Sequence, residues 1–71
     1  MICVKIIPKS VTKCLEMDKG SVTLNELLNM LRDYLEGEDV VVVVNGRIAE
    51  NHNAVVTEKD EIVIVEAFLG G

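Results

Sequence analysis

Val22-Thr23-Leu24-Asn25-Glu26-Leu27-Leu28 marks the start of a helix within a chain that is otherwise rich in strand-forming residues. In this stretch Thr23 and Glu26 form a capping box, in which each side chain satisfies an exposed backbone N–H of the other residue. Gly37 supplies a natural stop. The sequence therefore predicts an amphipathic helix over about residues 24–36, packed on a sheet through leucines at helical spacing. These are Leu24, Leu28, Leu31 and Leu35.

Two strands are expected before this helix. Ile2, Val4 and Ile6 alternate with Cys3, Lys5 and Ile7, which is the period-two pattern of a strand with one core face. Pro8-Lys9-Ser10 then turns the chain into a second strand over residues 11–17, its antiparallel partner in a hairpin. Because this turn lacks an Asn-Gly pair, the register of the hairpin stays open.

Three more strands are expected after the helix. The run from Val40 to Val44 is entirely β-branched and predicts a strand covered on both faces. Asn45-Gly46 is typical of a type I′ turn, so residues 47–49 should return beside the valines. A polar loop over residues 50–57, a turn at residues 58–60 and a last strand over residues 62–68 complete the chain.

This order of elements predicts an α+β fold, the β-grasp or ubiquitin-like roll. It is a mixed sheet of about four to five strands with one amphipathic helix. The first and last strands should be parallel neighbours, since a crossover containing the helix is what parallel pairing requires. We expect one β-grasp domain over residues 1–67 and a flexible Gly-Gly tail over residues 68–71.

Composition narrows the classes of function. With one Tyr, one Phe and no Trp in 71 residues, the core must be aliphatic. A net charge of −5 argues against nucleic acid, because phosphate binding needs clustered Lys and Arg, and favours a basic protein surface as partner. No apolar stretch approaches the roughly 18 residues of a membrane span, and no cleavage-like site follows the first strand. We expect a cytoplasmic protein that is a monomer when free.

Few side chains suggest metal or acid–base chemistry. Cys3 and Cys14 are too few for a disulfide scaffold or a zinc knuckle, and we expect both to be reduced and buried or half-buried, with sulfur relay as the alternative. His52 has no second ligand at useful spacing, so it is assigned no role and no metal site is expected. Four acidic side chains could steer a partner, although a solvated face is the simpler interpretation. They are Glu58, Asp60, Glu61 and Glu66.

The candidate site is the final stretch Phe68-Leu69-Gly70-Gly71. Glycine has no Cβ, so this backbone is narrow enough to thread a channel and present the Gly71 carboxylate to a partner enzyme. Gly71 is the expected point of covalent attachment, and Gly70, Leu69 and Phe68 are expected to thread the channel. Phe68 could equally be the last core residue of the final strand.

These residues resemble the ThiS/MoaD family of ubiquitin-like sulfur carriers, and the short chain is closer to ThiS. The resemblance covers most of the chain: the helix start at residues 21–28, the hairpin at residues 43–48, the turn at residues 58–62 and Gly70-Gly71. One departure is Lys59, where such proteins commonly place Gly, which leaves the turn type open.

The resemblance implies a chemistry for Gly71. A carboxylate with a pKa near 3.5 is ionised at neutral pH and is a poor electrophile, so it must be activated. An E1-like adenylyltransferase similar to ThiF or MoeB would join it to AMP, and sulfur would then displace AMP to leave a thiocarboxylate. Because the chain has no phosphate-binding loop, ATP and magnesium would belong to that partner. The chain would bind no cofactor and would be a co-substrate, not an enzyme.

Several acceptors remain open. The resemblance to ThiS favours thiamine thiazole formation with a thiazole synthase as partner, and a MoaD-like role in molybdopterin synthesis is the nearest alternative. A ubiquitin-like modifier would instead pass the activated Gly71 to lysine amines. A non-covalent β-grasp interaction module that docks on RNA or protein would not need Gly71 at all.

Overall fold

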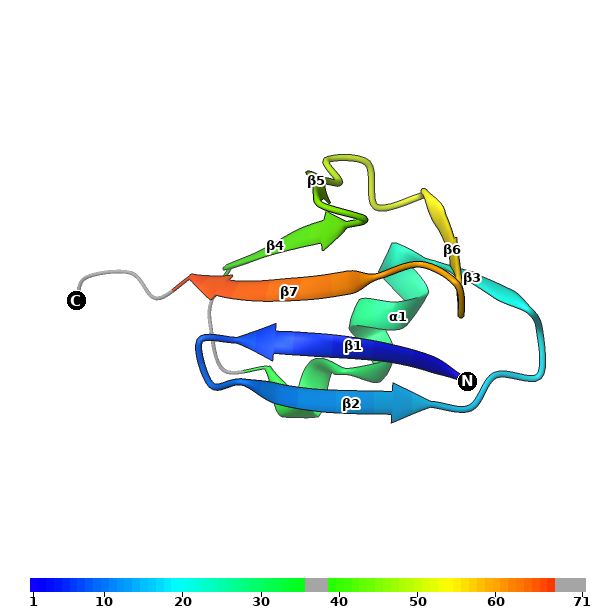
Figure 1. Cartoon of the computed structure of the whole chain (residues 1–71), viewed down its shortest axis with the longest axis horizontal. Coiled ribbons are helices and arrows are strands. Elements are labelled where there is room, and N and C mark those ends of the chain that lie inside the picture. The colour runs from blue at the N-terminus through cyan, green and yellow to red at the C-terminus, as the bar shows by residue number, and fades with distance from the viewer. Residues whose placement is uncertain (36–38, 68–71) are drawn as a thin grey trace.

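The computed structural model describes residues 1–35 and 39–67 and contains a large sheet, a small sheet, one α-helix and one 3₁₀ helix (Figure 1). The elements in the first of these ranges are β1 (Ile2–Ile7), β2 (Val11–Leu15), β3 (Ser21–Thr23), α1 (Leu24–Met30) and η1 (Arg32–Tyr34). Those in the second are β4 (Asp39–Val44), β5 (Arg47–Ile48), β6 (Val55–Thr57) and β7 (Ile62–Ala67). No helix within these two ranges is long and apolar enough to cross a bilayer.

The large sheet has the strand order β2-β1-β7-β4-β5. β7 runs parallel to β1, with Ile7 opposite Val65, and antiparallel to β4, with Val42 opposite Ile64. Helix α1 lies behind this sheet in Figure 1, so that view looks onto the outer face of the sheet. The mixed five-stranded sheet with one helix confirms the predicted α+β β-grasp fold, including the parallel pairing of the first and last strands.

The capping box at the start of α1 is present as predicted. The Glu26 backbone N–H donates to the Thr23 hydroxyl oxygen at 3.2 Å, and the Thr23 N–H donates to the Glu26 carboxylate at 3.2 Å. Two further helix N–H groups donate to a distant loop: Leu24 to the Ala54 carbonyl at 3.0 Å and Asn25 to the His52 carbonyl at 2.9 Å. The helix start is therefore satisfied both locally and from the loop before β6.

The helix ends earlier than the sequence predicted. α1 stops at Met30, and the Leu31 N–H is shared between the carbonyls of Leu27 and Leu28 at 3.1 and 3.2 Å. The chain continues as the tighter turn η1, since bifurcated bonds of this kind are common where an α-helix changes to 3₁₀ geometry. Gly37, the predicted stop, lies outside the described residues.

A short strand lies where a polar loop was predicted. β6 pairs antiparallel with β3, and Val56 opposite Val22 is only 1% exposed. This two-stranded sheet places Val56 in the core beside the helix start. The loop prediction for residues 50–57 was therefore wrong at its last three residues.

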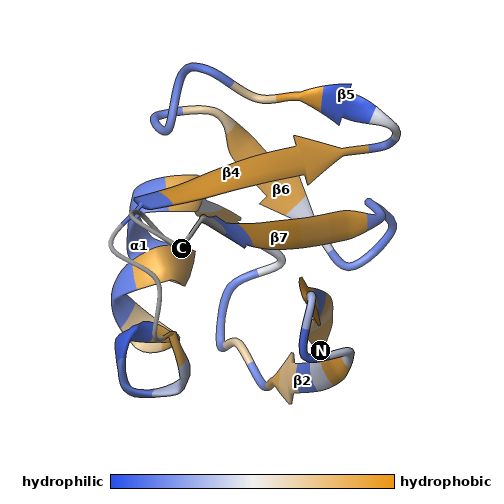
Figure 2. Cartoon of the chain, turned by 90° about the vertical axis from the view of Figure 1, so that its left-hand side faces the viewer, coloured by the Kyte–Doolittle hydropathy of each residue, from blue (hydrophilic) through white to orange (hydrophobic). Residues whose placement is uncertain are grey.

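The core is aliphatic, as the composition required, and its buried members come from β1, α1, β4, β6 and β7 together with Val22 and Leu31. Alternation along β4 is clear, because Val42 is 1% exposed whereas Val41 is 39% exposed. The valine run is consequently covered on one face only, and the predicted burial on both faces was wrong. Figure 2 shows β4 and β7 as hydrophobic strands, and their outward valines contribute to that colouring.

The turns follow their sequence signals closely. Asn45 and Gly46 have φ values of 52° and 82°, as a type I′ turn requires, and β5 returns beside β4. Lys59 has no positive φ, since the positive values among the described residues fall on Ser10, Asn45 and Gly46. A lysine is therefore accommodated in this turn without strain. β2 ends at Leu15 and β7 at Ala67, so the predicted second strand was too long and Phe68 lies outside the described residues.

Candidate functional site

The predicted site residues Phe68, Leu69, Gly70 and Gly71 all lie outside the described residues. The predicted division into a domain over residues 1–67 and a tail is likewise untested. What the structure does define is the end of β7, which leads into residues 68–71, and the surfaces beside it. The site is therefore built from those surfaces.

A buried ion pair holds the end of β7. Glu66 points inward and its side chain is 1% exposed, while the Lys9 ammonium lies 3.2 Å from its Oε1 atom. Lys9 comes from the turn between β1 and β2, so the pair ties that turn to the last strand. An ionised carboxylate buried to this degree needs such a counter-charge, because desolvation would otherwise be costly.

The same lysine also reaches η1. Its ammonium donates a hydrogen bond to the Tyr34 carbonyl, and the Lys13 ammonium lies 4.1 Å from the centre of the Tyr34 ring, in a cation–π contact. The β1–β2 hairpin, η1 and β7 are therefore fastened together at one end of the molecule. Sequence reasoning missed this cluster, since Lys9 and Glu66 are 57 residues apart and neither belongs to a motif.

An apolar patch lies on the outer face of the sheet. The register places Val41 opposite Val65, and Val43 opposite both Val63 and Ile48. These five side chains share the face opposite α1, because Val42 and Ile64 between them point into the core. With Ile7, which lies opposite Val65 on β1, they form what we call the outer patch.

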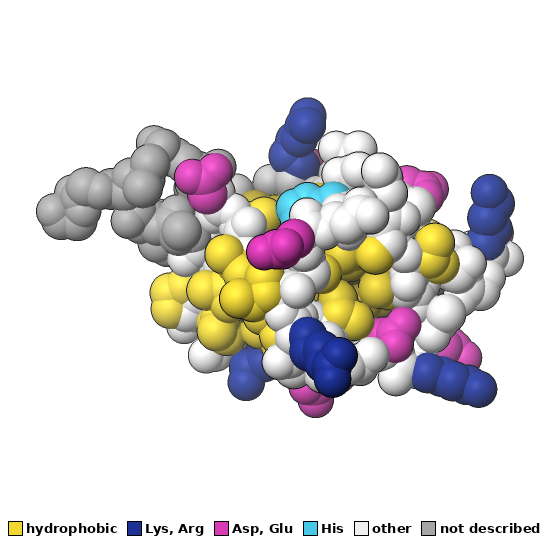
Figure 3. All heavy atoms as spheres, turned by 90° about the horizontal axis from the view of Figure 1, so that it is seen from above, with side chains coloured by type: hydrophobic (Ala, Val, Ile, Leu, Met, Phe, Trp, Pro, Cys, Tyr) yellow, Lys and Arg dark blue, Asp and Glu magenta, His cyan; other side chains and the backbone are white. Residues whose placement is uncertain are grey.

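The outer patch is open to solvent in part. Ile48 is 67% and Val41 is 39% exposed, and Val43, Val63 and Val65 are half-buried. Figure 3 views the side of the molecule that carries β4 and β5, and hydrophobic side chains gather there toward the end at which β7 finishes. Contiguous apolar surface on a small monomeric domain commonly marks an interaction site.

Three of the four acidic residues considered for steering a partner make contacts within the chain instead. Glu66 is buried against Lys9, and Glu58 pairs with the Met1 ammonium at 3.1 Å. Asp60 accepts hydrogen bonds from the Asn45 side chain at 2.9 Å and from the Thr57 N–H at 2.8 Å. The steering hypothesis in its original form is therefore wrong for Glu66, whose carboxylate does not reach solvent.

Asp60 connects the two turns at the far end of the sheet. Asp60 bonds to Asn45 and Thr57, and the side-chain oxygen of Asn45 in turn accepts a hydrogen bond from the Glu61 N–H at 2.9 Å. The Asn45 side-chain hydrogen bond, followed by the bond from the Thr57 backbone, lowers the pKa of the Asp60 carboxyl below its usual value. The ionised form is thus favoured in the folded state, and it organises the β6–β7 turn that carries Lys59.

The cysteines contradict the prediction. Cys3 and Cys14 lie opposite each other on β1 and β2 and are joined by a disulfide, and both are exposed. Ile2 and Val4 occupy the inward positions of β1, so the period-two pattern turns Cys3 outward. The expectation of two reduced, buried thiols was wrong because it followed the apolar context instead of the alternation.

Cys3 lies toward the opposite end of β1 from the point at which β7 ends. In the register of β1 and β7, Val4 lies opposite Ile62, so Cys3 is level with residue 61. The six steps from residue 61 to residue 67 span about 20 Å of strand.

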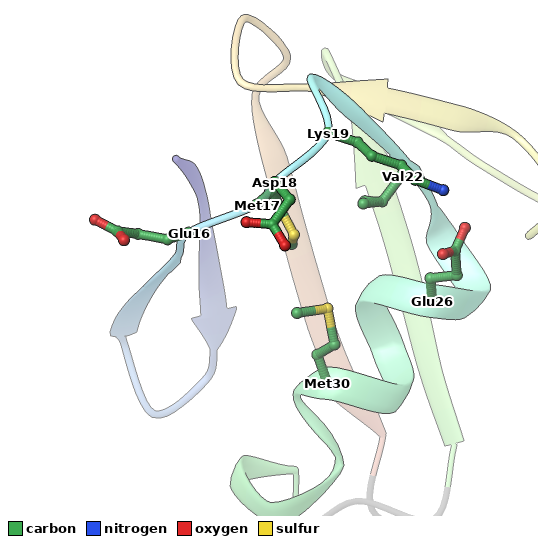
Figure 4. A pocket seen from close by; sticks show the side chains of 7 residues that line it. All are labelled: Glu16, Met17, Asp18, Lys19, Val22, Glu26 and Met30. Atoms are coloured by element: carbon green, nitrogen blue, oxygen red, sulfur yellow. The ribbon is translucent and has the colours of Figure 1, made fainter.

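A shallow groove of about 280 Å³ lies between the β2–β3 connection and α1 (Figure 4). Met17 and Met30 point toward each other across it, while Glu16 points away. The hydrogen bond from the Thr23 backbone N–H, followed by the one from the Thr23 side chain, lowers the pKa of Glu26. The Glu26 carboxylate therefore caps the helix in its ionised form and has no proton to donate at neutral pH. Nothing in the groove resembles acid–base machinery.

A metal-binding cluster is not found among residues 1–35 and 39–67. No group of three or more His, Cys, Asp or Glu side chains could hold a metal ion there. His52 contributes its backbone carbonyl to the helix start. A small domain with this mixed sheet and one helix belongs to the ubiquitin-like, β-grasp class of proteins.

Comparison with known families identifies the lineage. The profile of the ThiS family matches residues 6–71, and the chain therefore belongs to the ThiS family. Members of this family are small sulfur carriers in cofactor biosynthesis, not catalysts, and they generally work with E1-like adenylyltransferases and sulfur-accepting enzymes. A comparison with curated proteins gave no significant match.

The Asp60 network predicts a pH-dependent contribution to stability. Because the folded-state pKa is lowered, the contribution is present above the unfolded pKa of about 3.9 and disappears as pH falls through the folded value. Asp60→Asn should therefore lower the free energy of unfolding near neutral pH, and the difference from wild type should shrink toward pH 3. Urea denaturation of both proteins across this range measures it. A difference that stays constant with pH would contradict the assignment.

The ion pair at the end of β7 predicts an asymmetric response to mutation. Lys9→Met should cost about 1–3 kcal/mol of unfolding free energy, because it removes the counter-charge of a buried carboxylate. Adding Glu66→Leu should restore part of that loss, since an apolar pair carries no desolvation penalty. Lys5→Met, at an exposed position of β1, is the matched control and should change little. Equal costs for the Lys5 and Lys9 variants would refute a structural role for the pair.

Proposed function

We propose that this chain carries sulfur on Gly71, in thiamine thiazole formation, after adenylation by a ThiF-like or MoeB-like partner. The observation that carries the proposal is the ThiS match, which extends through Gly71. ATP and magnesium are supplied by the partner, and a thiazole synthase receives the sulfur. We place these events in the cytoplasm.

The proposed steps conserve atoms. The Gly71 carboxylate attacks the α-phosphorus of ATP, which forms the acyl adenylate and releases pyrophosphate. Hydrosulfide then attacks the activated carbonyl carbon and AMP leaves with the bonding electron pair. The product is a thiocarboxylate in which one oxygen of Gly71 has been replaced by sulfur. Every catalytic group in this scheme belongs to the partner.

The outer patch is the proposed docking surface for the activating enzyme. Ordering residues 68–71 in a channel would cost about 1–2 kcal/mol of backbone entropy per residue, so binding energy must come from the folded domain. Burial of apolar surface supplies about 25 cal/mol per Å². Ile48 and Val41 are the most exposed residues of the outer patch and so have the most apolar surface to bury. Because Val63 and Val65 lie on β7 itself, a partner seated there is next to the strand that leads to Gly71.

Intact-protein mass spectrometry tests the chemistry. The purified chain is incubated with a ThiF-like adenylyltransferase, magnesium ATP and sulfide, and the expected product is heavier by one oxygen-to-sulfur replacement. A variant lacking Gly71 is the control and should remain unmodified. An unchanged mass with every adenylyltransferase tried would overturn the proposal.

Three further readouts separate the alternatives: the identity of the sulfur acceptor, the presence of lysine conjugates, and partner binding after deletion of Gly71. A lysine modifier would give conjugates in which Gly71 is joined to a target amine, and a MoaD-like carrier would deliver sulfur to a molybdopterin precursor, not to thiazole. A non-covalent module would keep its binding partners when Gly71 is deleted. Each of these outcomes would replace the thiamine assignment with another named role.

The docking proposal predicts a position-specific loss of activation. Ile48→Glu should raise the KM of the adenylyltransferase for this chain by about 10-fold or more, since it places a charge in a surface that must be desolvated. Val55→Glu is the matched control: Val55 is 60% exposed but lies on β6, outside the outer patch. Steady-state adenylation kinetics distinguish the two variants. Equal effects, or none from Ile48→Glu, would place docking elsewhere.

A further inference from the structure

We propose that Cys3 and Cys14 form a reversible thiol–disulfide exchange site that takes small thiols as its substrates. Nothing in the proposed carrier chemistry uses these residues, and Cys3 lies about 20 Å along the sheet from the point at which β7 ends. The role of the cysteine pair is therefore separate from sulfur transfer at Gly71. It is carried by three features: the strand register, the exposure of both residues and the weak anchoring of β2.

The strand register brings the two sulfurs together independently of the bond. Cys3 and Cys14 are directly opposed, flanked by the pairs Ile2 with Leu15 and Val4 with Lys13, and their Cα atoms are 3.9 Å apart. The pairing of β1 with β2 would hold the two thiols side by side after reduction. A thiol held in this way has a high effective concentration toward its neighbour, so the bond can re-form readily.

Both residues face solvent, on the side of the sheet away from α1. A thiolate can therefore attack one Sγ atom, form a mixed disulfide and displace the other cysteine as a thiolate, which takes a proton from water. A second thiolate attacking the sulfur of the bound small thiol completes the reduction. The pair gains two electrons and two small thiols become one disulfide.

Reduction of the Cys3–Cys14 disulfide should loosen mainly β2. This strand lies at the edge of the large sheet, and its five residues alternate between half-buried and exposed, with no fully buried side chain. By contrast β1 buries Ile2, Val4 and Ile6. The disulfide is thus a covalent fastening on the least anchored long strand of the sheet.

The site shares a face with the outer patch. Cys3 and Lys5 occupy successive outward positions of β1, and Lys5 lies opposite Val63 of β7. A partner that covers the outer patch and extends along β1 past Lys5 and onto β2 would cover the disulfide as well. Exchange at this site is accordingly open in the free chain and would be restricted when that face is occupied. In a reducing compartment, exposed disulfides of this kind are usually transient and respond to redox conditions.

Glutathione is the probe for the test. Native wild-type protein, oxidised in air, should show no thiols with a thiol-reactive chromophore, and titration across glutathione redox buffers should give one reversible two-electron transition. Cys14→Ser should retain a stable glutathione adduct on Cys3, whereas wild type should expel glutathione by re-forming its own disulfide. Cys3→Ser/Cys14→Ser is the control and should not respond to glutathione.

Hydrogen exchange locates the structural effect. On reduction, the β2 amides bonded to β1 should exchange on the order of 10- to 100-fold faster, as expected for removal of a short covalent loop, while β4 amides change little. Two free thiols in the air-oxidised native protein, or reduction that occurs only after denaturation, would overturn the proposal. Neither readout depends on sulfur transfer at Gly71, so failure here and failure of the carrier proposal can be told apart.

Discussion

The double pairing of β7 is the constraint on which the rest of this structure depends. β7 lies between β1, to which it is parallel, and β4, to which it is antiparallel. Parallel neighbours require a crossover, and the chain uses that crossover to place α1 over one face of the sheet. Because strand side chains alternate, Ile62 and Ile64 complete the core while Val63 and Val65 complete the outer patch. A one-residue slip would exchange these roles, so the core and the docking surface are specified by the same register.

Much of this arrangement is predictable because its signals are local. The Thr23 and Glu26 box, the Asn45-Gly46 turn and the alternation in β1 each depend on residues within a few positions of one another. Together they determine the order of the elements, and topology then supplies the parallel pairing. The candidate site at Gly71 was read from sequence alone, and the ThiS match over residues 6–71 supports the family assignment without describing the site's geometry.

What the sequence did not predict depends on partners distant in the chain. β6 has three residues, too few to show a period, and its partner β3 lies more than 30 residues earlier. The helix was predicted too long because the leucine spacing continues past Met30. In the structure the chain beyond Met30 forms η1 instead, where Lys9 and Lys13 of the first hairpin contact the carbonyl and the ring of Tyr34. The Cys3–Cys14 pair required the register of that hairpin, which its turn residues do not specify. In each case a tertiary contact prevailed over a local preference.

Charge near the end of β7 has a structural role and little effect on the chemistry of Gly71. Glu66 and Gly71 are five residues apart, a span of about 17 Å if the chain threads a channel in extended form, as proposed. Coulomb interaction weakens with distance, and over such a span the adjacent Lys9 ammonium opposes the field of the Glu66 carboxylate. Lys9 neutralises Glu66 at 3.2 Å in any case. The role of the Lys9–Glu66 pair is therefore structural. It holds the end of β7, which leads into residues 68–71, against the first hairpin and η1. A partner bound to the outer patch would therefore find the end of β7 in one defined position.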